Sequence, residues 1–139
     1  MNRIKIKVIN YFETKLKDLS IESIKLNSEF ISLVDESRNK ISIHIYLNES
    51  ENRISCLIDD LEIVDECDYD IDEVLKYVDF IISNEIVKHE VYCKNKLVKR
   101  YYEFHQIIDG NLQKLKLYSF NKFVLFGDKK KVLFKFKPW

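Results

Sequence analysis

A change in the spacing of apolar residues constrains the fold of this 139-residue chain more than any other feature. Between positions 71 and 82 apolar residues recur at three- and four-residue intervals, which is the pattern of one stripe along an α-helix. These residues are Ile71, Val74, Leu75, Val78, Ile81 and Ile82. The segments on either side alternate apolar and polar residues instead, as strands do. The sequence therefore predicts a helix over 70–84 between two groups of strands.

The start of this helix carries its own signal. Asp70 precedes the first apolar position, and Glu73 follows three residues later. An acid at this position can accept hydrogen bonds from the first backbone N–H groups, and acids in a first turn oppose the helix dipole favourably. We expect Asp70 to cap the helix.

The clearest strand lies at 41–47, where Ile41, Ile43, Ile45 and Leu47 alternate with polar residues. SEFISLVD predicts a strand before it, and another begins at Arg53. After Asp59 and Asp60 the apolar positions change phase, which predicts a bulge or a sharp bend. Downstream, IVKHEVYC and LVKRYYEF flank the turn KNK and predict a hairpin. Two or three further short strands follow, rich in aromatic residues and lysine.

The N-terminal segment is ambiguous. Ile4, Ile6 and Val8 alternate as in a strand, whereas Ile4, Val8 and Phe12 also match helical spacing. We favour a helix from about Ile4 to Leu19. Since short turns join most strands, we predict an α+β fold with a mostly antiparallel sheet of six to eight strands. The N-terminal and central helices should pack on one face, within a single domain over residues 1–139.

Charge is distributed unevenly although the net charge is zero. Residues 48–85 contain two basic and thirteen acidic side chains, and residues 86–139 contain thirteen basic and four acidic ones. Eight of the acids fall between Asp59 and Asp72. Such asymmetry indicates either two surfaces of opposite sign or an acidic element packed against a basic one.

The acidic stretch can be compared with a calcium-binding loop. Asp68, Asp70 and Asp72 fit its first, third and fifth positions, but Glu73 stands where the sharp turn needs glycine. Paired catalytic carboxylates are the other chemical interpretation, and they require a pocket and unequal pKa values. We instead interpret the acids as a solvated surface with a helix cap, and we expect no metal site.

Other residue types give little support for catalysis. The three histidines are scattered one to an element, and no glycine-rich phosphate loop or nucleophile motif is present. Cys56, Cys67 and Cys93 form no CxxC pair, so we expect small buried residues and no disulfide framework. We predict a non-enzyme without a cofactor. No run is long and apolar enough for a membrane span, and nothing resembles a signal peptide, so we expect a cytoplasmic protein.

The basic C-terminal part offers an alternative function. LVKRYYEF and KKKVLFKFKPW interleave basic and aromatic residues, the combination that tracks a phosphate backbone and stacks bases. The same alternation is also typical of a half-buried sheet or a protected edge strand. Zero net charge weakens the nucleic-acid interpretation further, so it is kept as the alternative.

Residues 54–104 have a distinctive layout: a strand ending in acids, an acidic cap, a helix closing in FIISNEI, and a hairpin of the form VxxxxYCKNKLVKRYYEF. This layout resembles small bacterial immunity-type proteins that neutralise toxin domains of polymorphic or contact-dependent systems. The resemblance covers about a third of the chain. It implies an inhibitor that binds the active face of a cognate basic toxin, nucleases included.

Our leading hypothesis is therefore a protein-binding module that inhibits such a toxin through an acidic surface. Charge complementarity would guide this surface to a basic cleft, and Tyr69 would be the central aromatic anchor. The expected contact residues are Asp59, Asp60, Glu62, Asp65, Glu66, Asp68, Tyr69 and Asp70. We expect a monomer or a homodimer.

Overall fold

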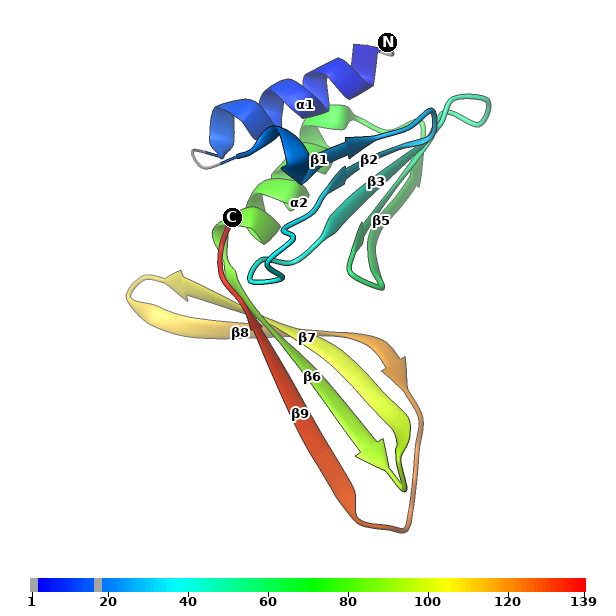
Figure 1. Ribbon diagram of the computed structural model, residues 1–139, viewed down its shortest axis with the longest axis vertical. Helices are drawn as coiled ribbons and strands as arrows, with labels where there is room; N and C mark the ends of the chain where they lie inside the picture. Colours follow the sequence, from blue (N-terminus) through cyan, green and yellow to red (C-terminus); the bar gives the residue numbers. More distant parts are fainter. Residues whose placement is uncertain (1–2, 17–18) are drawn as a thin grey trace. The chain divides into compact units, whose positions relative to one another are not determined.

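A computed structural model describes residues 3–16 and 19–139 of the chain. Its elements are two α-helices, one short 3-10 helix (Ile21–Ser23) and nine strands (Figure 1). They form two compact units: unit 1 extends to Phe80 and includes Trp139, and unit 2 extends from Ile81 to Pro138. The expectation of a single domain stays a prediction.

Unit 1 contains a five-stranded antiparallel sheet. Its strands are β1 (Ile24–Leu26), β2 (Phe30–Leu33), β3 (Ile43–Asn48), β4 (Arg53–Ile58) and β5 (Leu61–Cys67). They lie in chain order, β1-β2-β3-β4-β5, so each connection joins neighbours. β5 is consequently an edge strand, and the alternation predicted at 41–47 is present as β3, with buried and exposed residues in turn.

Two helices lie on one face of this sheet, α1 (Arg3–Lys15) and α2 (Ile71–Ser83) (Figure 1). The register places Ile31, Ile45 and Cys56 side by side on neighbouring strands, and all three are fully buried. Val8 and Phe12 of α1 and Val74 and Val78 of α2 are also buried. The α+β prediction, with both helices and an antiparallel arrangement, is confirmed.

α1 is shorter at its C-terminal end than the predicted range. The helix ends at Lys15, and Leu16 still donates its backbone N–H to the carbonyl of Phe12. Positions 17 and 18 of the predicted range lie outside the described residues, and Leu19 is not helical. One buried charge anchors the helix: Lys5 Nζ donates to the carbonyls of Asn27 and Ser28, at 2.7 and 2.6 Å.

The structure corrects the expectation of one strand bent at Asp59 and Asp60. These residues form the two-residue turn of a hairpin in which Ile58 pairs with Leu61, and Asp59 has a φ of 52°. The phase change has a second origin, because Leu57 pairs with Glu62 and Cys56 with Val64. Ile63 is therefore the extra residue of a bulge, which lets Leu61 and Val64 both be buried.

Unit 2 contains a four-stranded antiparallel sheet of longer strands. They are β6 (Glu85–Cys93), β7 (Lys96–Ile108), β8 (Asn111–Asn121) and β9 (Lys129–Phe136), in the order β8-β7-β6-β9. The predicted hairpin is confirmed as β6 and β7. Its turn is Lys94-Asn95, with φ of 50° and 63°, the positive values of the tight turns that match strand twist.

The connection from β8 to β9 crosses to the other side of the β6–β7 hairpin, because β9 pairs with β6. Residues 122–128 are not a strand. Val124 packs against a small cluster formed by Val91, Cys93 and Val98, while Phe123 remains 82% exposed. The nine strands thus form two sheets, where the sequence suggested one sheet of six to eight strands.

The cysteines differ from one another in burial. Cys56 and Cys93 are buried, as predicted, and burial raises the pKa of the Cys56 thiol to about 12. Cys67 is exposed, which corrects the expectation that it is a small buried residue. It is the last residue of the edge strand β5, where no strand covers its outer side.

Candidate binding surfaces

The predicted acidic contact residues occupy the edge of the sheet in unit 1. Asp59 and Asp60 form the turn that leads into β5, Glu62, Asp65 and Glu66 lie on that strand, and Asp68 to Asp70 connect it to α2. All of them are exposed except Asp59 and Tyr69, which are half-buried. We call β5 with its preceding turn the acidic edge.

Asp65 is neutralised by a neighbouring strand. Arg53 of β4 donates through Nε at 2.6 Å and through Nη2 at 2.5 Å to the two carboxylate oxygens of Asp65. Ser55 adds a hydrogen bond at 3.2 Å. The hydrogen bond from Arg53 holds the pKa of Asp65 below its usual range. Asp65 therefore has a local structural role and contributes little unsatisfied charge.

Two further acids have local structural roles. Asp70 Oδ1 accepts the backbone N–H of Asp72 at 2.9 Å, so it caps α2 as predicted. Glu73 does not complete the reciprocal arrangement; its Oε1 accepts from Lys76 Nζ at 2.8 Å. Asp68 Oδ1 accepts from Asn52 Nδ2 at 2.9 Å, which joins the residue before β4 to the residue after β5 at the open end of this hairpin.

Glu62 and Glu66 differ from these acids. In the part of the chain that the structure describes, neither side chain makes a hydrogen bond or an ion pair. Both are exposed on the edge strand. Asp59 and Asp60 do take part in interactions, and Asp59 raises the pKa of the nearby His44 against the larger lowering effect of burial. The unsatisfied negative charge of the acidic edge is therefore concentrated on Glu62 and Glu66.

Tyr69, the expected anchor, lies two residues after the acidic edge, in the connection to α2. Its side chain is half-buried, and burial, together with the charge of Glu49, raises the pKa of its hydroxyl.

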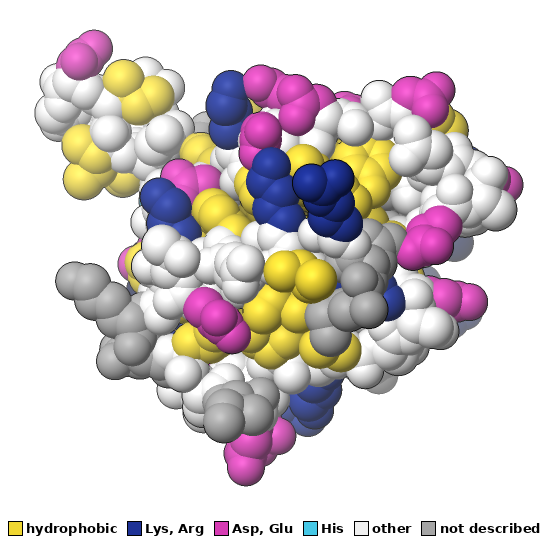
Figure 2. Space-filling view, turned by 90° about the horizontal axis from the view of Figure 1, so that it is seen from above, with side chains coloured by type: hydrophobic (Ala, Val, Ile, Leu, Met, Phe, Trp, Pro, Cys, Tyr) yellow, Lys and Arg dark blue, Asp and Glu magenta, His cyan; other side chains and the backbone are white. Residues whose placement is uncertain are grey.

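Acidic side chains occur at several separate places on the face of the molecule shown in Figure 2. A partner that recognises the acidic edge must therefore distinguish it by geometry as well as by charge.

Unit 2 brings together a group of side chains that sequence reasoning treated as scattered. Glu103 of β7 is buried, and its Oε1 lies 2.7 Å from Nε2 of His105. Its Oε2 lies 3.9 Å from Nε2 of His89 on β6. The hydrogen bond with His105 holds the pKa of Glu103 below its usual range, whereas burial lowers the pKa of His89. We call these three residues the His–Glu cluster.

The register explains how this cluster forms. Glu103 and His105 are two residues apart on β7 and so share a face. His89 pairs with Tyr101, and their rings stack with centroids 4.3 Å apart. The E-x-H spacing was visible in the sequence, but the partner on β6 depends on the register of the hairpin. His44 lies apart, in unit 1, where its Nδ1 is 2.7 Å from Ser32 Oγ.

A second feature of unit 2 is a cavity of about 480 Å³ beside the turn end of the β6–β7 hairpin. Four lysines are among its lining residues, together with Tyr101, Asn121 and apolar side chains. The basic and aromatic alternation was visible in the sequence, but the cavity that these residues line depends on strand pairing. We call this feature the lysine cavity.

Metal binding has no geometric support among residues 3–16 and 19–139. No three histidine, cysteine, aspartate or glutamate side chains there lie close enough together to hold an ion. No described helix has the length and apolar character required to cross a membrane.

No family model, curated protein or solved structure matches this chain.

Proposed function

We propose that this protein is a non-enzymatic binding module whose partner is a basic protein that docks on the acidic edge. The observation that carries the proposal is the pair Glu62 and Glu66. Both carboxylates are exposed on one strand, and within the described residues neither has a cation or hydrogen-bond donor. A partner that supplies lysine or arginine side chains satisfies both charges, guides the encounter and favours one register.

The backbone of β5 supports the same proposal. As an edge strand it presents N–H and C=O groups on its outer side that no strand of the sheet pairs. A partner segment can add to such an edge through main-chain hydrogen bonds, with side chains giving specificity. Two copies of β5 placed together would set acid against acid, which disfavours self-association through this edge. A basic heterologous partner fits better than a second copy.

The finer identity that we propose for this module is an immunity-type inhibitor of a cognate bacterial toxin, acting in the cytoplasm. A toxin that acts on nucleic acid carries a basic cleft for its substrate, and an acidic edge imitates the charge of that substrate. Tyr69 contributes an aromatic contact beside the charges, of the kind that often dominates interface energetics. Inhibition then follows from occlusion of the cleft and needs no chemistry by this chain.

The test pairs two double charge reversals in the full chain. Glu62→Lys with Glu66→Lys removes the unsatisfied charge, while Glu22→Lys with Glu36→Lys makes the same change at exposed acids of unit 1 outside the acidic edge. Each variant is co-expressed with the toxin domain encoded beside this protein, and growth and direct binding are measured. We expect the first pair to lose protection and binding, and the second pair to keep both.

Two results would overturn parts of this proposal. Equal protection by both pairs would remove the acidic edge as the contact surface. Absence of protection and of binding by the unmodified protein would remove the inhibitor identity. Circular dichroism of each variant shows that a loss of binding does not arise from unfolding.

A further inference from the structure

The lysine cavity lies in unit 2 and plays no part in the function proposed above. It is formed by residues of β6, β7, β8 and β9 and by the segment that joins β8 to β9. Its volume of about 480 Å³ lies within the usual range of small-molecule sites. Apolar side chains form part of its lining: Val91, Val98, Phe123 and Val124.

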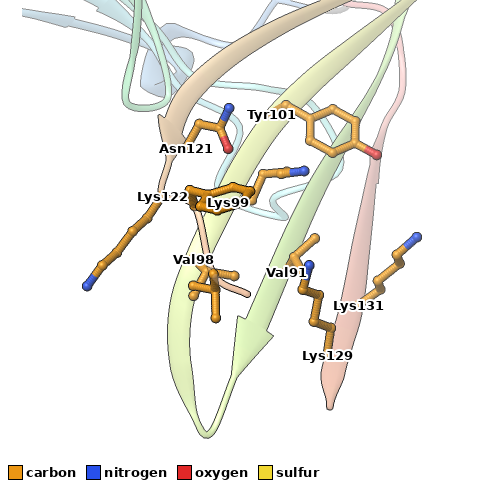
Figure 3. A pocket seen from close by; sticks show the side chains of 10 residues that line it. Val91, Val98, Lys99, Tyr101, Asn121, Lys122, Lys129 and Lys131 are labelled. Atoms are coloured by element: carbon orange, nitrogen blue, oxygen red, sulfur yellow. The ribbon is translucent and has the colours of Figure 1, made fainter. Parts of the chain in front are cut away.

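The charge of the cavity is entirely positive. Its four lysines are Lys99, Lys122, Lys129 and Lys131. In the described part of the chain none of the four makes an ion pair with an acid. In Figure 3, Lys99 extends from β7 toward β9, where Lys129 and Lys131 lie, whereas Lys122 points away from the others. Lys99, Lys129 and Lys131 line one cavity that contains no acidic side chain, and a positively charged lining of this kind attracts an anion.

Neutral donors complete the arrangement. Asn121 lies directly across from Lys99 in the β7–β8 register, and its side-chain amide can donate two hydrogen bonds. Tyr101 directs its hydroxyl toward β9 in Figure 3. Its ring is held in place by stacking on His89 and by a contact with Tyr118, with centroids 5.1 Å apart. Several donors and no acidic acceptor suit a phosphate group.

One aromatic side chain at the cavity is placed so that a nucleobase can stack on it. Phe123 lines the cavity yet is 82% exposed, so it leaves a flat apolar ring in water. Its neighbour Val124 is packed on the cluster of Val91, Cys93 and Val98, which fixes the backbone from which Phe123 projects. The backbone N–H of Lys122 also donates to the carbonyl of Val98, at 2.7 Å. The Phe123 ring therefore projects from a segment whose backbone is held in place by these contacts.

We propose that the lysine cavity binds a nucleotide. Lys99, Lys129 and Lys131, with Tyr101 and Asn121, hold its phosphate, and the base stacks on Phe123. The nucleotide comes either from solution or from a single strand of nucleic acid, since both present the same phosphate and base. An acidic peptide supplies negative charge but no planar base. Stacking on Phe123 therefore favours a nucleotide over an acidic peptide.

Binding to the full chain is measured with three probes: ATP, a short oligothymidylate and inorganic triphosphate. The combined variant Lys99→Ala, Lys129→Ala and Lys131→Ala should lose affinity for all three probes. For the oligonucleotide, removal of three cations should also make the slope of log affinity against log salt shallower by about 2. The matched control is Lys96→Ala, Lys135→Ala and Lys137→Ala, which removes three exposed lysines of unit 2 outside the cavity.

Phe123→Ala tests whether a nucleobase stacks at the cavity. Because the side chain is exposed, its removal leaves the fold intact, and it should weaken ATP and oligothymidylate but not triphosphate. Tighter binding of the oligonucleotide than of ATP identifies a strand as the source, and the reverse identifies a free nucleotide. No binding at low salt, or equal losses in the two lysine variants, would overturn the site. Equal binding of triphosphate and ATP, unaffected by Phe123→Ala, would overturn the nucleotide as ligand.

Discussion

Glu103 Oε1 lies 2.7 Å from His105 Nε2, and Glu103 is more than nine-tenths buried. A buried carboxylate is costly unless a donor stabilises its charge, and this hydrogen bond supplies that donor. The same carboxylate group lies 3.9 Å from His89, which links β6 and β7 through side chains as well as through their backbone ladder. The His–Glu cluster therefore makes the stability of this protein dependent on pH.

The first prediction concerns His89. Burial lowers its pKa in the folded protein, so protonation favours the unfolded chain, and stability is lost as the pH falls below about 6.5. His89→Phe removes the titrating group and keeps an aromatic ring against Tyr101. The loss of stability between about pH 7 and pH 5 should be smaller in this variant. Urea denaturation at each pH checks it, and an unchanged pH dependence would contradict the assignment.

The second prediction concerns Glu103. The hydrogen bond with His105 lowers the pKa of Glu103 in the folded protein. The ionised carboxylate therefore makes its full contribution to stability above the ordinary carboxyl pKa of about 4.3. The contribution is lost as the pH falls through the lower folded-state pKa. In Glu103→Gln the part of the stability that is lost when Glu103 is protonated at acidic pH should disappear. Glu62→Gln changes an exposed acid and should show the same loss as the unmodified protein. Thermal unfolding midpoints between about pH 5 and pH 3 distinguish the two variants.

The third prediction uses the two glycines. Gly127 has a φ of 114°, and a Cβ there would lie 2.8 Å from Cys93 Sγ. Gly110 has a φ of 78° and no atom within 4 Å of an added Cβ. Both substitutions by alanine carry backbone strain, because L side chains rarely adopt a φ of this sign; the cost is roughly 1–2 kcal/mol for a left-handed residue. Gly127→Ala adds a clash in a buried cluster and should destabilise unit 2 more than Gly110→Ala. Equal effects in chemical denaturation would show that the cluster adapts.

The fourth prediction concerns the cap of α2. Asp70→Ala removes the acceptor of the Asp72 N–H and should lower the free energy of unfolding by about 1 kcal/mol. Asp70→Asn retains a side-chain oxygen at the same position and should retain most of that stability. If both variants lose the same amount, charge rather than the hydrogen bond is responsible. Urea denaturation curves give the comparison.

The fifth prediction concerns the core of unit 1. Ile45 is fully buried on β3 between Ile31 and Cys56, so Ile45→Ala should cost about 2–5 kcal/mol and Ile45→Val about 0.5–1.5 kcal/mol. The single tryptophan is a convenient probe, because Trp139 Nε1 donates to the carbonyl of Ile41 at 2.7 Å. Its fluorescence reports on unit 1. Indistinguishable unfolding of the two variants would contradict the assigned packing.

Features governed by local periodicity were predictable from the sequence. The alternation over 41–47, the helical stripe over 71–82 and the Asp70 cap depend on neighbours within a few residues, and each is present in the structure. The hairpin turn at Lys94-Asn95 belongs with them. The phase change after Asp59 was detected, but the sequence alone did not separate a turn from a bulge, and both occur.

The candidate sites depend on contacts that sequence spacing does not encode. Arg53 satisfies Asp65, and Glu103 meets His89, only because strand register brings distant residues opposite one another. The lysine cavity likewise requires β9 to return beside β6, which brings Lys129 and Lys131 into the same cavity lining as Lys99. By itself the sequence determined the central helix, most of the strands and the signs of charge along the chain, but it left the N-terminal segment ambiguous between helix and strand. Only the tertiary structure decided which charges are satisfied, because pairing between strands is a long-range choice made by packing and hydrogen bonding of the whole sheet.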